Sequence, residues 1–340
     1  MFWWRTSNPV KQRLPAERFA SAIQTGIRYA YNNALLRATL LRTVGFFLFA
    51  SAYWALLPLI AHDRISGGAQ LYGVLLGSIG AGALGGALGL EWLRSKLGPD
   101  RLVALGELGT ALALVLFGAA REPITAIAAS LIAGACWIVV LSSLNVSAQF
   151  SLPEWVRGRG LAVYVTVFFG AMTLGSACWG EIARVGGLAF AHFLAAGGAL
   201  FAIPLTWRCK PQSGAAIDLA PSMHWPAPIV SAAVDADAAP VLVTIEYHVS
   251  HGKREMFLMA VDKLARERRR DGAYAWGIFE DVAQSGRFIE TFTVESWLEH
   301  LRQHERVTNA DRVIEEHVHG LLQTSPKITH LVAPRRSADV

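Results

Sequence analysis

Residues 71–101 read LYGVLLGSIGAGALGGALGLEWLRSKLGPDR, and this stretch decides the fold class. The part from Leu71 to Leu90 carries no charge and is about as long as a helix must be to cross the hydrocarbon core of a bilayer. In water, so much glycine would weaken a helix by roughly 1 kcal/mol per residue. In lipid the backbone bonds hold the helix, and small residues let a second helix approach closely. The stretch therefore predicts a membrane protein built from tightly packed helices.

A small residue recurs at every fourth position of this span, which predicts a face for helix packing. We expect Gly85→Leu to block the close packing of this span. The repeat consists of Gly73, Gly77, Ala81, Gly85 and Gly89, and Ser78, Gly82 and Gly86 widen the same side.

Composition sets further limits. The 340 residues are 53% hydrophobic and only 17% charged, and most of the charge lies before Thr43 and after Pro240. The net charge of +5 comes from the N-terminal segment, and no basic face with interleaved aromatic residues accompanies it, so we expect no nucleic-acid partner. The three cysteines are too few and too scattered to predict a disulfide framework.

Six apolar spans predict a transmembrane bundle over residues 43–208. Short loops that would lie on the side of the N-terminus, together with the N-terminal segment, hold fourteen lysines and arginines, against three on the other side. Because positive residues stay in the cytoplasm, we expect both termini to be cytoplasmic; the resemblance described below implies a bacterial inner membrane. The spans are residues 44–61, 71–90, 102–120, 124–144, 161–180 and 186–207.

Residues 1–42 form a basic segment whose Phe19, Ile23, Ile27 and Tyr31 fall at helical spacing. This pattern predicts a cytoplasmic amphipathic helix on the membrane surface. A helix that packs against the protein would give the same pattern.

Residues 209–240 are rich in proline, alanine and serine and are expected to form a linker. The alternation and helical periods after residue 240 then predict the order β-α-β-β-α-β, which is that of a small ferredoxin-like domain over residues 241–334, followed by a tail at 335–340. Ser296 and Glu299 are spaced as a capping box that opens its second helix.

The span pattern resembles the C-terminal half of a major facilitator superfamily transporter. The loop signature of that superfamily is present in degraded form as Gly89, Gly98, Asp100 and Arg101, and the usual aspartate after the first glycine is missing. Residues 153–160, PEWVRGRG, are similar to the corresponding turn of the branch called transmembrane secretion effectors, or enterobactin-exporter-like permeases.

The C-terminal region resembles the tail domain of the same branch, which in turn resembles dimeric α/β barrels of the antibiotic-biosynthesis-monooxygenase type. The residues that carry the resemblance are 268–273 (RRRDGA), 290–292 (ETF), Ser296, Trp297, Glu299, His300 and 302–304 (RQH). Such transporters have twelve spans in two halves with the substrate path between them, and this chain supplies six. We therefore expect a fragment, or a subunit completed by a complementary six-span half or by a second copy.

Charged and polar groups inside the spans are candidates for the pathway or for ion coupling. Glu107 could line the pathway or couple a proton, but it could also reach the interface or pair with Arg101. Asn145 and Gln149 suit a cavity wall or interhelical hydrogen bonds, and His192 fits a packed histidine better than a titrating one. Arg157 and Arg159 are expected to fix topology and to contact lipid headgroups.

In the tail, His300 and His304 lie four residues apart, a spacing that can place two imidazoles on one metal ion. Only Glu299, His317 and His319 are available to complete a site, so we expect a solvated helix face, no metal and no cofactor. The monooxygenase resemblance adds Trp276, His248 and Trp297 as residues to watch. We see no nucleophile with a base, hence no enzyme.

Three functions follow. The first is export of a drug or metabolite by alternating access, with proton coupling implied by the resemblance and the tail as a regulatory or dimerising module. The second is a membrane-anchored oxygenase, which would need a tail cavity that holds convergent polar groups and is sealed from water. Without such a cavity the tail would be a binding module. The third is a half-transporter that does not transport.

Overall fold

The computed structural model describes residues 19–209, 217–225, 228, 234–236 and 238–334. The chain divides into two compact units. The membrane unit runs from Asn33 to Ile217, and the tail unit comprises the described residues before Asn33 and those after Ile217. The linker expected at residues 209–240 and the tail at 335–340 lie partly or wholly outside the described residues.

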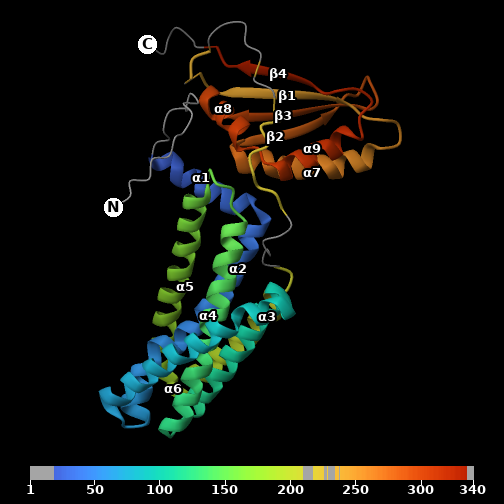
Figure 1. Cartoon of the computed structure of the whole chain (residues 1–340). Coiled ribbons are helices and arrows are strands. Elements are labelled where there is room, and N and C mark those ends of the chain that lie inside the picture. The colour runs from blue at the N-terminus through green and yellow to red at the C-terminus, as the bar shows by residue number, and fades with distance from the viewer. Residues whose placement is uncertain (1–18, 210–216, 226–227, 229–233, 237, 335–340) are drawn as a thin grey trace, which may run out of the picture. The chain divides into compact units, whose positions relative to one another are not determined.

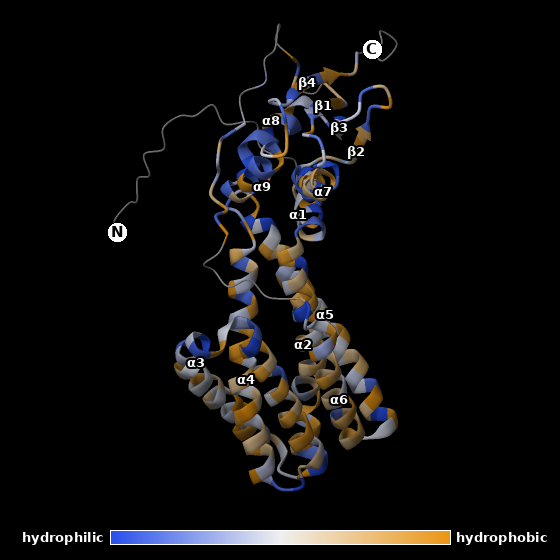
Figure 2. Cartoon of the chain, turned by 90° about the vertical axis from the view of Figure 1, so that its right-hand side faces the viewer, coloured by the Kyte–Doolittle hydropathy of each residue, from blue (hydrophilic) through white to orange (hydrophobic). Residues whose placement is uncertain are grey.

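The membrane unit is made of helices (Figure 1). They are α2 (Ala34–Leu59), which continues into the π-helical turn η1 (Ile60–Arg64), α3 (Gly68–Ala119), α4 (Pro123–Phe150), α5 (Arg157–Gly186) and α6 (Leu188–Thr206). Within the described residues, five helical segments have the length and apolar composition to cross a membrane. Figure 2 shows hydrophobic residues along the lengths of all of them. The chain is therefore embedded in a membrane.

The long helix α3 reverses direction at Gly98. This residue has φ 72° and ψ 167°, a backbone conformation that suits glycine, and Pro99 follows it. Gly86 before the break and Gly109 after it face the adjacent residues Ala135 and Cys136 of α4. Twenty-three residues of straight helix would span about 35 Å. Both arms of α3 can meet the same part of α4 only if the chain turns back between them.

Close backbone packing between α3 and α4 uses glycines other than the predicted repeat. A Cβ atom on Gly82 would overlap the backbone carbonyl of Leu131, and one on Gly134 would overlap that of Ile79. By contrast, no described atom lies within 4 Å of a Cβ placed on Gly73, Gly77 or Gly85, and at Gly89 only Leu93 of the same helix comes within this distance. Within the described residues Gly85 therefore makes no close contact with another helix, so a packing effect of Gly85→Leu would require a partner outside this unit. The repeat of small residues at every fourth position identified the right helix. The contact with α4, however, is made by Gly82 and Gly86, which lie beside that repeat on the helix surface.

The first membrane helix begins at Ala34, ten residues before the predicted span. Hydropathy placed its start after Arg42 because charged residues disfavour a span. In the structure Arg42 is buried among the helices, so the charge does not end the helix. Further along, Phe47 of α2 packs its ring against Trp137 of α4 and Phe168 of α5, with centroids 5.0 and 4.5 Å away.

The tail unit is an antiparallel four-stranded sheet with the order β2-β3-β1-β4 and with helices on one face (Figure 1). The strands are β1 (Val241–His248), β2 (Ala275–Glu280), β3 (Arg287–Val294) and β4 (Lys327–Val332). The helices are α7 (Arg254–Asp271), α8 (Trp297–Arg306) and α9 (Asn309–His319). Alternate residues of β1 and β3 are buried beneath the helices, as in Val243, Tyr247 and Phe292.

The helix starts of the tail unit differ in part from the prediction. The Ser296 side chain accepts a hydrogen bond from the Glu299 backbone and so caps α8, but the reciprocal capping box occurs at Thr308 and Asp311, at the start of α9. The carboxylate of Glu299 instead accepts hydrogen bonds from Arg306 and Arg28, at 2.6 and 3.1 Å. The carboxylate of Glu299 thus pairs with two arginines and does not cap the helix. Arg306 lies at the other end of α8, and Arg28 lies far away in the sequence, on α1.

The basic N-terminal segment contains helix α1 (Phe19–Asn32), which packs on α7 within the tail unit. Its buried side is formed by Thr25, Gly26, Tyr29 and Ala30, with Tyr29 fully buried beside Arg270. Ile23, Ile27 and Tyr31 are exposed. The helix thus packs on protein through one side and leaves the predicted apolar side uncovered in the tail unit.

Candidate functional site

A buried ion pair links two helices of the membrane unit. The guanidinium of Arg42 on α2 lies 3.3 Å from the carboxylate of Asp100, just after the break in α3. The Arg42 side chain is 3% exposed and that of Asp100 34% exposed. Of the predicted loop residues, Gly98 provides the turn and Asp100 the partner of Arg42, whereas Arg101 is exposed.

Glu107 lies two turns further along α3 and is buried. Its Oε1 atom has no hydrogen-bond partner among the described residues. Arg42, and not the expected Arg101, is the cation that acts on it electrostatically. A buried carboxyl group with incomplete hydrogen bonding is costly in apolar surroundings, so Glu107 remains the strongest functional candidate in the membrane unit.

His192 of α6 is fully buried. Its Nδ1 atom lies 2.7 Å from the carbonyl oxygen of Leu188, which matches the packed, hydrogen-bonded alternative. Its Nε2 atom has no partner in the part of the chain that the structure describes.

Arg64 donates hydrogen bonds to the carbonyls of Gly118 and Ala120, both at 2.6 Å, and so satisfies the C-terminal end of α3.

The other membrane candidates are exposed, apart from Arg159. Gln149 donates a hydrogen bond to Asn145 at 3.1 Å, one turn earlier on α4, and both side chains are exposed. Arg157 is exposed at the start of α5, and Arg159 is half-buried. The structure therefore groups Glu107 with Arg42 and Asp100, and it does not bring Asn145 and Gln149 into the interior of this unit.

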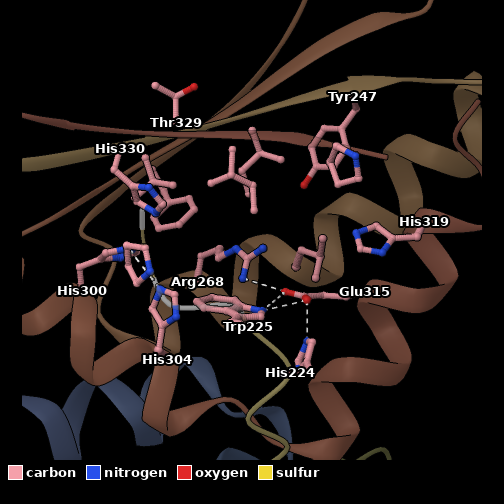
Figure 3. Close-up of a pocket in the computed structure, with 17 residues that line it drawn as sticks. His224, Trp225, Tyr247, Arg268, His300, His304, Glu315, His319, Thr329 and His330 are labelled. Atoms are coloured by element: carbon pink, nitrogen blue, oxygen red, sulfur yellow. Dashed lines mark hydrogen bonds and ion pairs between the residues drawn. The ribbon is translucent and has the colours of Figure 1, made fainter. Parts of the chain in front are cut away.

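The tail unit holds a cavity of about 450 Å³ between the sheet and the three helices (Figure 3). The sheet contributes an apolar wall, whereas the helices and the segment before β1 contribute most of the polar groups. The lining residues used below are Tyr247, Arg268, His300, His304, Glu315 and His330, with His224 and Trp225 from the segment before the sheet.

Arg268 of α7 is the central charged group of this cavity and is 5% exposed. It donates a hydrogen bond to Glu315 at 3.0 Å, and its Nε atom lies 3.5 Å from Glu290. The guanidinium also lies 4.6 Å from the ring centroid of Trp225, a cation–π distance. Its positive charge is therefore held by two carboxylates and an aromatic ring.

The two carboxylates are themselves fully bonded. Glu290 accepts hydrogen bonds from Tyr247 at 2.6 Å and from Trp276 at 2.8 Å. Glu315 accepts from Trp225 and pairs with His224 at 2.7 Å. Burial alone would raise the pKa of Glu315, but the Arg268 charge and these hydrogen bonds lower it to about 2, so this carboxylate is ionised at neutral pH.

Three histidines converge on the other side of Trp225 (Figure 3). His300 and His304 come from α8 and His330 from β4, and their candidate ligand nitrogens all lie within 4.8 Å of one another. Burial lowers the pKa of His300 to about 3 and that of His304 to about 4. The pKa of His330 is also lowered by burial. All three are therefore neutral imidazoles near pH 7, the form that binds metals.

The expectation of a solvated face for His300 and His304 is wrong, because His300 is 1% exposed and His304 half-buried. The third histidine is His330 rather than His317 or His319. The sequence could not identify it, because it is brought to the pair by the register of β4, in which His330 is opposite Val243 of β1.

The remaining tail candidates have structural contacts. Trp276 bonds Glu290, as described above. Trp297 is buried, with its ring centroid 5.5 Å from that of His300 and 6.0 Å from that of His330. His248 lies on the other face of the sheet, 3.7 Å from Glu246. Trp297 therefore supports the histidine cluster, and His248 does not belong to it.

Arg268, which lines the cavity, and its partner Glu290 both had a signal in the sequence. Arg268 continues the helical period of the apolar residues Phe257, Val261 and Leu264, and Glu290 takes an inward position between Phe288 and Phe292 in an alternating strand. A charged residue at a core position predicts a buried, paired group. The arginine run 266–270 concealed this signal for Arg268.

The family model described as transmembrane secretion effector matches residues 1–338. A search of curated proteins finds no match. Among solved structures, the chain is similar to a conserved protein from Methanosarcina mazei Go1, with 15% identity, coverage of 28% of this chain and 94% of that chain, and a TM-score of 0.26. It is also similar to Rv0793 from Mycobacterium tuberculosis, with 22% identity, coverage of 30% and 100%, and a TM-score of 0.25.

Proposed function

Because this chain belongs to the transmembrane secretion effector family of major-facilitator-type transporters, we propose that it is half of a permease that exports small molecules by alternating access. Membrane transport is the function of the family. Export, the half-transporter architecture and proton coupling are our proposals. The observation that supports proton coupling is the buried Glu107, which lies two turns after Asp100 on α3 and is acted on electrostatically by Arg42.

We propose six crossings, with the two arms of α3 as the second and third. The reversal at Gly98 supports this count because it returns the chain along α4. The small residues Gly73, Gly77 and Gly85, which meet no described atom, would then face a complementary six-span half or a second copy. The excess of positive loops supports cytoplasmic termini in a bacterial inner membrane. In this arrangement Asn145 and Gln149 would line the substrate path.

In this proposal Glu107 couples the movement of a proton to a rearrangement of the helices. The guanidinium of Arg42 pairs with Asp100 and also acts electrostatically on Glu107. Protonation of Glu107 removes one of the two negative charges that act on Arg42. The attraction of Arg42 to Asp100 is then no longer opposed. Loss of the proton restores the competition. Because Arg42 lies on α2 and both carboxyl groups lie on the second arm of α3, this change alters the contact between those helices.

The test uses everted bacterial membrane vesicles that contain the chain, energised to make their lumen acidic, with the dye Hoechst 33342 as the probe. We expect uptake of the dye into the vesicles that stops when a protonophore is added. Glu107→Gln should reduce the rate at least about tenfold, because a neutral amide cannot exchange a proton. Glu91→Gln is the matched control, since Glu91 is an exposed glutamate on the same helix. An unchanged rate in Glu107→Gln would contradict the coupling role.

Native mass measurement of the complex in mild detergent tests the half-transporter architecture. A complex with a second six-span chain, or a homodimer, is the expected result. A stable monomer that moves no dye would favour the non-transporting alternative.

The tail cavity favours a second candidate function, in which the tail unit is a ligand-binding module. We propose a ferredoxin-like fold for it, supported by the antiparallel order β2-β3-β1-β4. Trp225 lies at the cavity wall, so binding of a small molecule should change its fluorescence. A dye substrate that changes the emission of the wild-type chain but not of Trp225→Phe would support this role.

A further inference from the structure

The histidine cluster of the tail unit has the chemistry of a metal site. It contains three imidazoles and no lysine, and the ligand nitrogens of the three come within 4.8 Å of one another. Neutral imidazole is the nitrogen ligand that Zn²⁺ and its neighbours among the divalent transition metals prefer. The residues come from two elements, α8 and β4, and meet only because the tail unit folds.

The spacing of two ligand atoms fits tetrahedral coordination. The Nε2 atoms of His300 and His304 lie 3.3 Å apart. With Zn–N bonds of about 2.0–2.1 Å, two ligands of a tetrahedral ion are separated by about 3.3–3.4 Å. The nitrogen of His330 lies within 4.8 Å and would have to move inward by up to about 1.5 Å, a shift within the range of side-chain rotation. The His330 side chain is half-buried on an edge strand, so it has room to move.

Contacts behind the cluster hold its rings in place. The Nδ1 atom of His300 lies 3.2 Å from Oε1 of the buried Gln303, which leaves Nε2 for a metal. His304 hydrogen-bonds to the backbone of Trp225. The ring of Trp297 packs against those of His300 and His330. Such contacts orient metal-binding histidines in known sites and raise their affinity.

The charge balance around the cluster permits a cation. Arg268 is the cation nearest to this part of the cavity, and it is already paired with Glu290 and Glu315. Three histidines leave one tetrahedral position unfilled, and all three histidines line the tail cavity. This pattern is typical of sites that keep one position for water or a small ligand.

We propose that His300, His304 and His330 bind one divalent transition-metal ion, Zn²⁺ or a close analogue, with a fourth position open to the tail cavity. This site does not depend on transport, and a failure of the transport assay leaves it unaffected. An oxygen or nitrogen donor of a small molecule in the cavity would complete the coordination.

The test uses the full-length chain without a polyhistidine tag, purified in mild detergent and treated with chelator. Titration with Zn²⁺ against a chromophoric competitor should give one site per chain with a Kd of about 1 µM or lower. Co²⁺ should produce the intense visible absorption of a tetrahedral site, which Zn²⁺ then abolishes. Absence of both signals in the wild-type chain overturns the proposal, whatever the variants do.

Two variants locate the site. His330→Ala should weaken Zn²⁺ binding at least about 100-fold, since loss of a ligand exceeds the 10–100-fold cost of losing an outer contact. His304→Ala should do the same. His319→Ala is the matched control, because His319 lines the same cavity outside the cluster, and it should retain full affinity. Equal affinity in His330→Ala, or loss of binding in His319→Ala alone, would overturn the proposal. The Co²⁺ spectrum of the wild-type chain decides the case if a variant misfolds.

Discussion

The membrane unit and the tail unit bury polar groups in different ways. In the membrane unit the buried Arg42 pairs with Asp100 and acts electrostatically on Glu107, and the helices approach one another through glycine. In the tail unit Arg268 and Arg270 each form ion pairs with two carboxylates, and these buried pairs accompany an apolar core. Lipid gives little hydrophobic drive for helices to associate, so close backbone contact takes its place. Water supplies that drive in the tail, whose core can then tolerate a dense ionic network.

The largest expected effect breaks the packing of the membrane unit. A leucine at Gly82 would overlap the backbone of Leu131, and a backbone atom cannot turn away as a side chain can. Overpacking against side chains costs about 1–3 kcal/mol, and an overlap with a backbone carbonyl should exceed that range because it forces the two helices apart along their contact. We expect Gly82→Leu to abolish monodisperse protein in detergent size-exclusion chromatography.

Gly85→Leu is the matched control on the same helix. No described atom lies near a Cβ at this position, so the chain alone should fold normally. A defect that appears in Gly85→Leu only when a partner half is present would indicate that this face contacts the partner. Equal behaviour of Gly82→Leu and Gly85→Leu would contradict the packing described here.

The second effect breaks the ionic network of the tail. Arg270 bonds Asp271 and Asp311, at 2.7 and 2.8 Å, and all three are buried. Arg270→Met leaves two buried carboxylates without their cation, which costs about 3–5 kcal/mol. Hydrogen exchange of peptides from α7 and α9 should accelerate strongly, while peptides from α4 should not change. Arg266→Met, at an exposed position of α7, is the control and should exchange as the wild type does.

The third effect concerns pH and is smaller. Burial, helped by the Asp311 charge, raises the pKa of Glu267 from 4.5 to about 9. The folded tail thus keeps a proton that the unfolded chain releases, so this contribution to stability is complete below pH 4.5 and is lost as the pH rises towards 9. Glu267→Gln removes the ionisable group and should stabilise the tail by about 2 kcal/mol at neutral pH.

The gain in stability is measured by urea unfolding at two pH values, with hydrogen exchange of α7 as the probe of the tail unit. The gain in Glu267→Gln should nearly vanish at about pH 3.5, one unit below the ordinary pKa, where the Glu267 carboxyl group is mostly neutral in the folded and in the unfolded chain. Glu255→Gln, at an exposed position of the same helix, should show no such dependence on pH. A gain that does not change with pH would mean that the amide packs better, and that burial of a charge is not the cause.

The candidate sites were partly visible in the sequence. The apolar pattern and loop charges led to Glu107 and His192, because charges inside spans are rare enough to stand out. The i, i+4 spacing led to His300 and His304. The partners Arg42, His330 and Glu315 were not found, since each reaches its neighbour from another helix, another strand or across the cavity. Hydropathy also assigned Arg42 to the region before the span, although its ion pair makes it part of the interior.

The sequence by itself determined that this chain is a membrane protein with a separate α/β tail, because hydrophobic periodicity reports how each segment meets lipid, water or core. It also marked α3 as the helix of close contact. Only the tertiary structure decided which glycines make that contact, which cation serves Glu107, and that His330 joins His300 and His304. The physical reason is the same in each case: a pattern along one segment states which side is buried, whereas a site depends on the angle and register at which two segments meet.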